Sequence, residues 1–135
     1  DFDSVVFRIT GKEGKHLMAT VLQGGRVGSN KGAVVSKLLQ LAPITPKDKA
    51  AVEIGLSMGI KNFALSFTHF ADDVHRVREI IGDRTLISKI ESIQGILNLK
   101  EILPLVDQIL IDRGDLSREI PIEKIPFIIR FYFPL

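Results

Sequence analysis

Residues 85–91, T-L-I-S-K-I-E, and residues 107–116, D-Q-I-L-I-D-R-G-D-L, give the clearest indication of the fold. Each is a short run of aliphatic and β-branched residues that ends in charge, as a buried strand does at its rim. Lys89 and Glu91 are two positions apart, so in a strand they point to the same face. Charged side chains at the C-terminal ends of parallel strands are where α/β proteins usually place their chemistry.

Helical and strand patterns alternate on both sides of these stretches. Helices are expected at residues 46–58, 71–81, 92–103 and 122–130, and strands at 61–67, 84–90 and 107–111. Thr45 suits the N-cap of the first helix, Gly82 ends the second, Pro104 ends the third and Pro126 predicts a kink in the last. Strands spaced about 23 residues apart with helices between them require a parallel sheet. Both a (β/α) barrel and a doubly wound sheet fit this order, and three strands alone would leave two open edges.

The N-terminal part has a different pattern. Residues 2–10 and 16–22 alternate in polarity and read as two strands of a hairpin around a polar turn at residues 11–15. A glycine-rich loop follows at residues 23–32, and residues 34–42 fit either a strand or a connection. The sequence therefore predicts a small antiparallel β unit ahead of the α/β segment.

Composition narrows the class of protein. The 135 residues are 45% hydrophobic and 25% charged, which predicts one small folded domain. There is no cysteine, so neither a disulfide framework nor a cysteine-based zinc site is expected, and a reducing compartment fits. A net charge of +2, one Tyr and no Trp argue against nucleic-acid binding. No apolar run approaches the roughly 20 residues of a membrane span, and the acidic start argues against a signal peptide. We expect the chain to begin within a fold.

Lys89, Glu91 and Asp115 are the main candidate site residues. Mg²⁺ in proteins prefers one or two carboxylates together with substrate oxygens. Glu91 and Asp115, at neighbouring strand ends, could supply these carboxylates, and Lys89 would neutralise charge on an anionic substrate. The alternative is a strand-end salt bridge on a solvated rim.

Three weaker candidates surround this group. Arg113-Gly114-Asp115 is either a turn or a set of backbone N–H groups open to an anion. Ser66 either lines the same rim or caps the following turn. The loop at residues 24–32 lacks the pattern of a phosphate loop and fits a hinge, although Lys31 could reach a nucleotide phosphate if the loop faces the cleft. The histidines lack the spacing of metal ligands.

A series of short motifs now resembles one family. They are G-S-N-K-G at residues 28–32, I-T-P-K-D-K-A at 44–50, A-L-S-F at 64–67, A-D-D-V at 71–74, I-S-K-I-E at 87–91, E-I-L at 101–103, R-G-D-L at 113–116 and E-I-P at 119–121. In order and spacing they resemble pyruvate kinase. That family has a (β/α)₈ TIM barrel with a small β-barrel lid inserted after the third strand, and a C-terminal domain. The resemblance implies that residues 1–37 end the lid (B-like) domain and that residues 38–135 are a partial (β/α) barrel (A-like) domain with parallel strands four to six.

The resemblance also implies an activity. The family is cytoplasmic and glycolytic, usually tetrameric, and moves a phosphoryl group between phosphoenolpyruvate and ADP, giving pyruvate and ATP, with Mg²⁺ (or Mn²⁺) and usually K⁺, whose ligands are not in this chain. By resemblance, Lys89 is the catalytic lysine, and Glu91 and Asp115 hold the divalent metal. The resemblance also implies that the substrate is contacted by Lys89, Ser66, Arg113, Gly114 and Asp115. The backbone N–H groups of Gly114 and Asp115 would face phosphoenolpyruvate. Lys31 resembles a lid lysine near the nucleotide.

Departures from the family pattern leave two alternatives. Asp112 stands where the family usually has Ala, Ser117 where it has Gly and His69 where it has Arg, and A-V-V-S-K follows K-G in place of V-N-L-P-G. The strands before the lid, a later threonine-bearing strand and the effector domain have no counterpart here, and F-Y-F-P-L at residues 131–135 is unlike the family. One alternative is a non-catalytic regulatory or interaction relative. The other is a metal-dependent lyase or aldolase on a related barrel, against which the lid-like hairpin argues.

Overall fold

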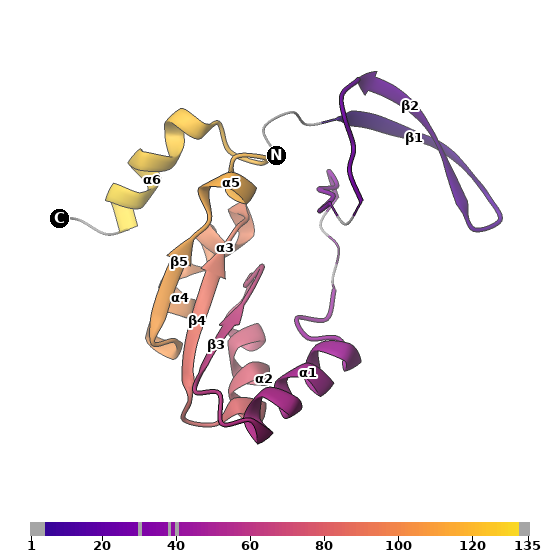
Figure 1. Cartoon of the computed structure of the whole chain (residues 1–135). Coiled ribbons are helices and arrows are strands. Elements are labelled where there is room, and N and C mark those ends of the chain that lie inside the picture. The colour runs from indigo at the N-terminus through magenta and orange to yellow at the C-terminus, as the bar shows by residue number, and fades with distance from the viewer. Residues whose placement is uncertain (1–4, 30, 38, 40, 133–135) are drawn as a thin grey trace. The chain divides into compact units, whose positions relative to one another are not determined.

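The computed structural model describes residues 5–29, 31–37, 39 and 41–132, and the chain divides into two compact units, Asp1–Leu38 and Leu39–Leu135. The first unit contains an antiparallel hairpin and the second a parallel sheet with helices (Figure 1). The coarse fold class predicted from the sequence is confirmed, since parallel and antiparallel sheets occupy the expected segments. The completed eight-stranded barrel, and the assignment of the units to lid and barrel domains, stay predictions.

The hairpin of the first unit pairs β1 (Val6–Glu13) with β2 (His16–Gln23). Gly14 has a φ of 58°, the left-handed conformation that a two-residue hairpin turn needs. The predicted turn at residues 11–15 was wrong at its start, because β1 continues through Glu13 after an irregularity between Ile9 and Gly11. Of the predicted strand at residues 2–10, the first three positions lie outside the described residues. No helix or strand occurs in the described part of residues 24–42.

The second unit opens with α1 (Pro46–Ser57), whose start is fixed by a capping box. The Asp48 amide donates to Thr45 Oγ1 at 3.2 Å, and the Thr45 amide donates to Asp48 Oδ2 at 2.9 Å. The Thr45 hydroxyl also donates to Asp48 Oδ2 at 2.6 Å, and this bond, followed by the one from the Thr45 amide, holds the pKa of Asp48 below its ordinary value. The helix start predicted from Thr45 and Pro46 is confirmed.

Three parallel strands form the centre of this unit in the order β3 (Asn62–Leu65), β4 (Thr85–Ile90) and β5 (Gln108–Ile111). Alternation along β4 buries Leu86, Ser88 and Ile90 on one face. Lys89 lies on the other face of the sheet and is paired with Leu110 of β5. Leu110 is 43% exposed. The predicted strand at 61–67 was three residues too long, and Phe67 directs its amide to Glu91 instead of to a strand. The predicted strands at 84–90 and 107–111 each began one residue too early.

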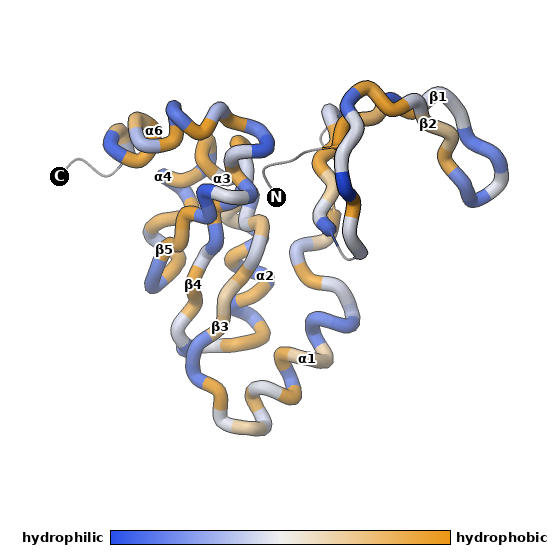
Figure 2. The backbone as a smooth tube through the Cα atoms, turned by 45° about the horizontal axis from the view of Figure 1, so that its top comes forward, coloured by the Kyte–Doolittle hydropathy of each residue, from blue (hydrophilic) through white to orange (hydrophobic). Residues whose placement is uncertain are grey.

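Helices α2 (Ala71–Ile81), α3 (Ile93–Leu97) and α4 (Leu99–Ile102) connect the strands and lie on one side of the sheet (Figure 1). Apolar side chains from this face of the sheet and from the helices make the core. Its fully buried members are Val74, Ile81, Leu86, Ile90, Leu99, Ile102, Leu116 and Ile125. Figure 2 shows the corresponding hydrophobic colour along much of the three strands.

The segment after β4 departs from the prediction of one helix at residues 92–103. It is interrupted at Asn98, whose side chain donates to the carbonyl of His69 at 2.7 Å. The segment therefore forms two short helices, and Leu97, which the prediction placed inward, is 65% exposed. Pro104 lies within a short 3-10 helix (Leu103–Leu105) that precedes β5.

The segment after β5 contains two helices. α5 (Arg113–Leu116) is a single helical turn at the position where the sequence predicted either a turn or a set of open backbone N–H groups, and α6 (Ile125–Tyr132) follows a 3-10 helix (Ile122–Lys124). The predicted kink at Pro126 was wrong, since Pro126 falls in the first turn of α6, where its missing N–H costs no hydrogen bond.

A polar cluster ties the N-terminal ends of the strands to α2. Asp107 Oδ2 accepts hydrogen bonds from the Leu86 amide at 2.7 Å and from Arg78 at 2.6 Å. Arg78 also donates to the carbonyl of Arg84 at 2.6 Å. Together these contacts set the register between β4 and the chain entering β5, and so the position of both C-terminal ends.

Candidate metal centre at the strand ends

Glu91, directly after β4, is the centre of the candidate site. The residue is only 2% exposed, and both of its carboxylate oxygens have partners. Oε2 accepts the backbone N–H of Phe67 at 2.6 Å, and Oε1 accepts Lys89 Nζ at 2.6 Å. A buried carboxylate needs such hydrogen-bond partners, and the two bonds hold the Glu91 side chain in one position.

The loop after β3 supplies the Phe67 amide in an unusual conformation. Phe67 has a φ of 51°, a left-handed value that costs a non-glycine residue free energy unless its surroundings enforce it. The next residue, Thr68, is fully buried, donates its amide to the Lys89 carbonyl at 3.2 Å and accepts the Ser88 hydroxyl at 2.6 Å. These bonds fix the loop against β4 and hold the Phe67 N–H toward Glu91.

Gly95 in α3 allows this close packing. A Cβ at Gly95 would lie 2.6 Å from the Thr68 carbonyl oxygen, closer than real Cβ contacts. Only glycine therefore lets the start of α3 pack against the loop that carries Phe67 and Thr68.

Lys89 connects the buried Glu91 carboxylate to Ser66 and Asp112, which lie with it at the rim formed by the C-terminal ends of the strands. Besides its bond to Glu91, Nζ lies 3.5 Å from Ser66 Oγ and 3.7 Å from Asp112 Oδ2. The pKa of Lys89 is raised, first because its ammonium donates to Glu91. Burial opposes this rise, and the negative charges of Glu91, Asp112 and Asp115 add to it. Lys89 is thus a fully charged ammonium group at neutral pH.

Asp112 is the N-cap of α5. Its Oδ1 accepts the backbone N–H groups of Gly114 at 3.1 Å and Asp115 at 3.2 Å. These are the two N–H groups that the sequence predicted to be open to an anion, and in the structure they donate to a carboxylate of the chain itself. Ser117 closes the same turn by donating its hydroxyl to the Gly114 carbonyl at 2.7 Å.

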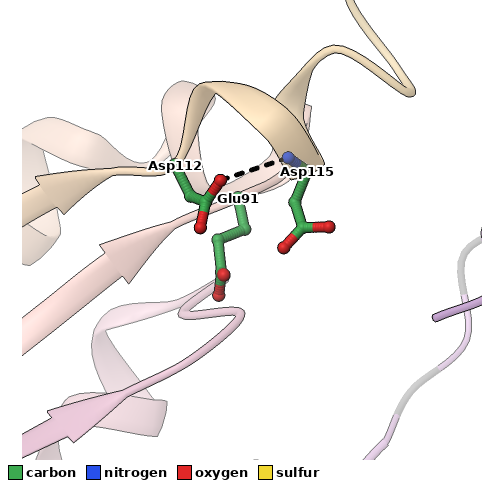
Figure 3. Close-up of side chains that lie close together, drawn as sticks. All are labelled: Glu91, Asp112 and Asp115. Carbon is green, nitrogen blue, oxygen red and sulfur yellow. Dashed lines mark hydrogen bonds between the residues drawn. The ribbon is translucent and has the colours of Figure 1, made fainter. Parts of the chain in front are cut away.

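Three carboxylates converge at this rim. Glu91, Asp112 and Asp115 each offer an oxygen, and the three oxygens lie within 4.8 Å of one another. Figure 3 shows the three side chains turned toward a common space in front of the strand ends. Asp115 also pairs with Arg118 at 2.8 Å. A set of only carboxylate oxygens suits a hard divalent cation such as Mg²⁺ or Mn²⁺.

The predicted site residues fall into two groups. Ser66, Lys89, Glu91 and Asp115 lie together at the strand ends, with Arg113 and Gly114 exposed on the adjoining turn. Lys31 lies in the first unit, so its proximity to this site stays a prediction. The roles assigned to these residues also stay predictions.

Sequence reasoning missed three contributors. Asp112 was named only as a departure from the family pattern, although an Asp two residues before the Gly-Asp amides is a standard N-cap signal. The buried hydroxyls of Thr68 and Ser88 left no recognisable signal, because their pairing depends on the contact between the β3 loop and β4.

The fold and the site define a class: an α/β protein with a candidate divalent-metal centre at the carboxyl ends of parallel strands. Comparison with known proteins identifies the family. Residues 1–132 match the model of "Pyruvate kinase, barrel domain", and the chain belongs to the pyruvate kinase family.

Curated relatives agree with this membership. The chain is 36% identical over 128 residues to a pyruvate kinase of Clostridium perfringens, covering 90% of this chain and 27% of that protein. It is 39% identical over 112 residues to one of Agrobacterium vitis, covering 82% and 23%, and 37% identical over 123 residues to one of Geobacillus stearothermophilus, covering 87% and 21%. The chain thus spans about a quarter of the length of these relatives.

Across the described residues, none of the helices has both the length and the apolar character needed to cross a bilayer.

Proposed function

We propose that this chain carries part of the active site of a pyruvate kinase, which transfers a phosphoryl group between phosphoenolpyruvate and ADP to give pyruvate and ATP in glycolysis. The observation that supports the proposal most is the contact of Lys89 Nζ with Glu91 Oε1 at 2.6 Å beside two further carboxylates. Phosphoryl transfer depends mostly on positioning and on neutralising negative charge, and this arrangement offers both a fixed cation and a cation-binding carboxylate set.

Glu91 and Asp115 are the proposed metal ligands. Their oxygens lie close enough to share one ion, and Glu91 is held rigid by Phe67, which reduces the reorganisation needed for binding. Mg²⁺ or Mn²⁺ held there would offset charge on the substrate oxygens and on the transferring group. K⁺, which the family usually uses, would take its ligands from residues outside this chain.

Lys89 is the proposed catalytic lysine. Its ammonium group is anchored by Glu91 but still 24% exposed at the side chain, so it can also reach a ligand in front of the rim. In that position it would stabilise the negative charge spread over the transferring phosphoryl oxygens. Its raised pKa keeps it charged across the physiological range.

The remaining assignments complete the proposal. Ser66, Arg113 and the Gly114 and Asp115 amides would contact phosphoenolpyruvate, and Lys31 would contact ADP or ATP. Residues 1–37 would belong to the lid domain and residues 38–135 to the barrel domain of a cytoplasmic protein that assembles into tetramers when full length.

One observation favours a second candidate, a non-catalytic relative. Asp112 occupies the Gly114 and Asp115 amides, which reduces the donors available to a substrate. A relative that keeps the barrel segment for regulation or interaction would retain the fold without the transfer reaction.

A chimera distinguishes the two candidates. Residues 1–132 would replace the matched segment of the Clostridium perfringens pyruvate kinase, and pyruvate formation from phosphoenolpyruvate and ADP would be measured with Mg²⁺. We expect turnover that disappears when Lys89→Met is introduced. A folded chimera without turnover would contradict the proposed activity and support the non-catalytic relative.

A further inference from the structure

Five charged side chains contact one another at the strand ends. Lys89 and Arg118 contribute two positive charges, and they face the three carboxylates of Glu91, Asp112 and Asp115. These five groups carry a formal net charge of −1, and the exposed Arg113 on the adjoining turn adds one positive charge. The Asp112 carboxylate therefore makes this rim less favourable for an anion by one full charge.

Asp112 also occupies the groups that an anion would use. Its Oδ1 accepts both the Gly114 and Asp115 amides, and its Oδ2 lies 3.7 Å from Lys89 Nζ. One side chain thus interacts with two backbone donors and with the rim's catalytic ammonium group. An incoming anion must displace these charge-assisted contacts before it can make its own.

We propose that Asp112 is a specificity-determining residue that acts as an internal competitor for anions at Lys89 and at the Gly114 and Asp115 amides. The inference rests on the proposed function for the identity of the anion. Its physical content is more general: any phosphate-bearing anion competes with the Asp112 carboxylate for Lys89 and the two amides. A divalent cation adds two positive charges and attracts the Asp112 carboxylate.

Two substitutions separate the charge of Asp112 from its capping role. Asp112→Asn removes the charge but keeps an oxygen that can accept the Gly114 and Asp115 amides, so α5 keeps an N-cap. Asp112→Ala removes the charge and also frees both amides. The matched control is Asp83→Ala, which removes an exposed carboxylate just before β4 begins, at the opposite end of that strand from Lys89.

The experiment is calorimetric titration of phosphoenolpyruvate and, separately, inorganic phosphate into the 135-residue chain and its variants. Each titration is done once with a chelator and once with saturating Mn²⁺. With the chelator we expect both anions to bind Asp112→Ala at least about tenfold more tightly than the unaltered chain, Asp112→Asn to be intermediate, and Asp83→Ala to match the unaltered chain. With Mn²⁺ the difference among the variants should shrink.

The outcomes separate this inference from the proposed function. Folded Asp112→Ala and Asp112→Asn variants that bind neither anion more tightly in the chelator would overturn the inference, even if phosphoenolpyruvate binds well with Mn²⁺. Phosphate binding that tightens in Asp112→Ala without any preference for phosphoenolpyruvate would support the inference and argue against the proposed function. If Asp112→Ala does not fold, Asp112→Asn decides, since it keeps the N-cap.

Discussion

Phe67 donates its backbone N–H to Glu91 Oε2 at 2.6 Å, across 24 positions of sequence, from a left-handed backbone conformation. This bond commits one carboxylate oxygen to a fixed partner and leaves Oε1 to face Lys89 and the other acids. Rigid carboxylates of this kind make good ligands because they lose little freedom when an ion binds. This hydrogen bond therefore links the loop after β3 to the carboxylate after β4 that we propose as a metal ligand.

Glu91→Gln tests the metal assignment. The substitution keeps the size of the side chain and an oxygen for the Phe67 amide but removes the charge that a divalent cation requires. We expect the dissociation constant for Mn²⁺, measured by calorimetry, to rise roughly tenfold or more. Glu101→Gln, on the exposed surface of α4, is the matched control and should leave the affinity unchanged. Equal Mn²⁺ affinity in the Glu91→Gln variant would rule out Glu91 as a ligand.

Lys89→Met tests the catalytic assignment. In the chimera with a complete pyruvate kinase, we expect phosphoryl transfer to fall to background, because the ammonium group proposed to stabilise the transferring group is removed. The free energy of unfolding should also fall by about 1–3 kcal/mol, since the buried Glu91 carboxylate loses its charged partner. Lys89→Arg keeps the charge and should recover most of the stability. Appreciable turnover by Lys89→Met would mean that the lysine is only part of a rim salt bridge.

Gly95→Ala tests the packing that holds the site. A Cβ at this position would lie 2.6 Å from the Thr68 carbonyl oxygen, so either α3 or the β3 loop must move. We expect a loss of about 1–3 kcal/mol in the free energy of unfolding, measured with urea. Gly24→Ala is the control, because a Cβ there meets nothing within 4 Å. Identical stability of the Gly95→Ala variant and the unaltered chain would contradict the described contact.

Asp107 makes stability depend on pH at acid values. The backbone N–H of Leu86, and then Arg78, hold the pKa of Asp107 below its ordinary value of 3.8. Because the folded pKa is the lower one, the contribution of Asp107 is complete above pH 3.8 and is lost as pH falls through the folded pKa. Asp107→Asn should therefore reduce stability at pH 7, with a difference that shrinks below pH 3.8. Urea unfolding at several pH values measures this.

The control for the acid series is Asp83→Asn, which removes an exposed carboxylate near the same end of the sheet. It should change the free energy of unfolding little at pH 7. A stability difference between Asp107→Asn and the unaltered chain that persists or grows on acidification would show that Asp107 acts through packing rather than through its charge.

The regular elements could be predicted because their signals are local. Thr45 and Pro46 begin α1, alternation along residues 85–90 defines β4, and Gly82 ends α2. The site was predicted in part for the same reason: Lys89 and Glu91 share a strand face by spacing alone, and Asp115 follows the next strand.

The remainder depends on contacts between distant segments. The amide of Phe67 reaches Glu91 only because the β3 loop packs on β4, and that packing requires Gly95 in a helix that comes later in the chain. The break at Asn98 likewise follows from its bond to the His69 carbonyl, 29 positions earlier. Periodicity cannot reveal such bonds, since neither partner differs from an ordinary loop or helix residue in sequence.

The most direct test of the proposed site is the calorimetric titration of Mn²⁺ into the folded chain with and without phosphoenolpyruvate. If Lys89, Glu91 and Asp115 form part of a phosphoryl-transfer site, phosphoenolpyruvate should strengthen Mn²⁺ binding, because the cation and the anionic substrate attract each other when both are bound there. A folded chain that binds Mn²⁺ with the same affinity in both titrations, or does not bind it, would contradict that central claim.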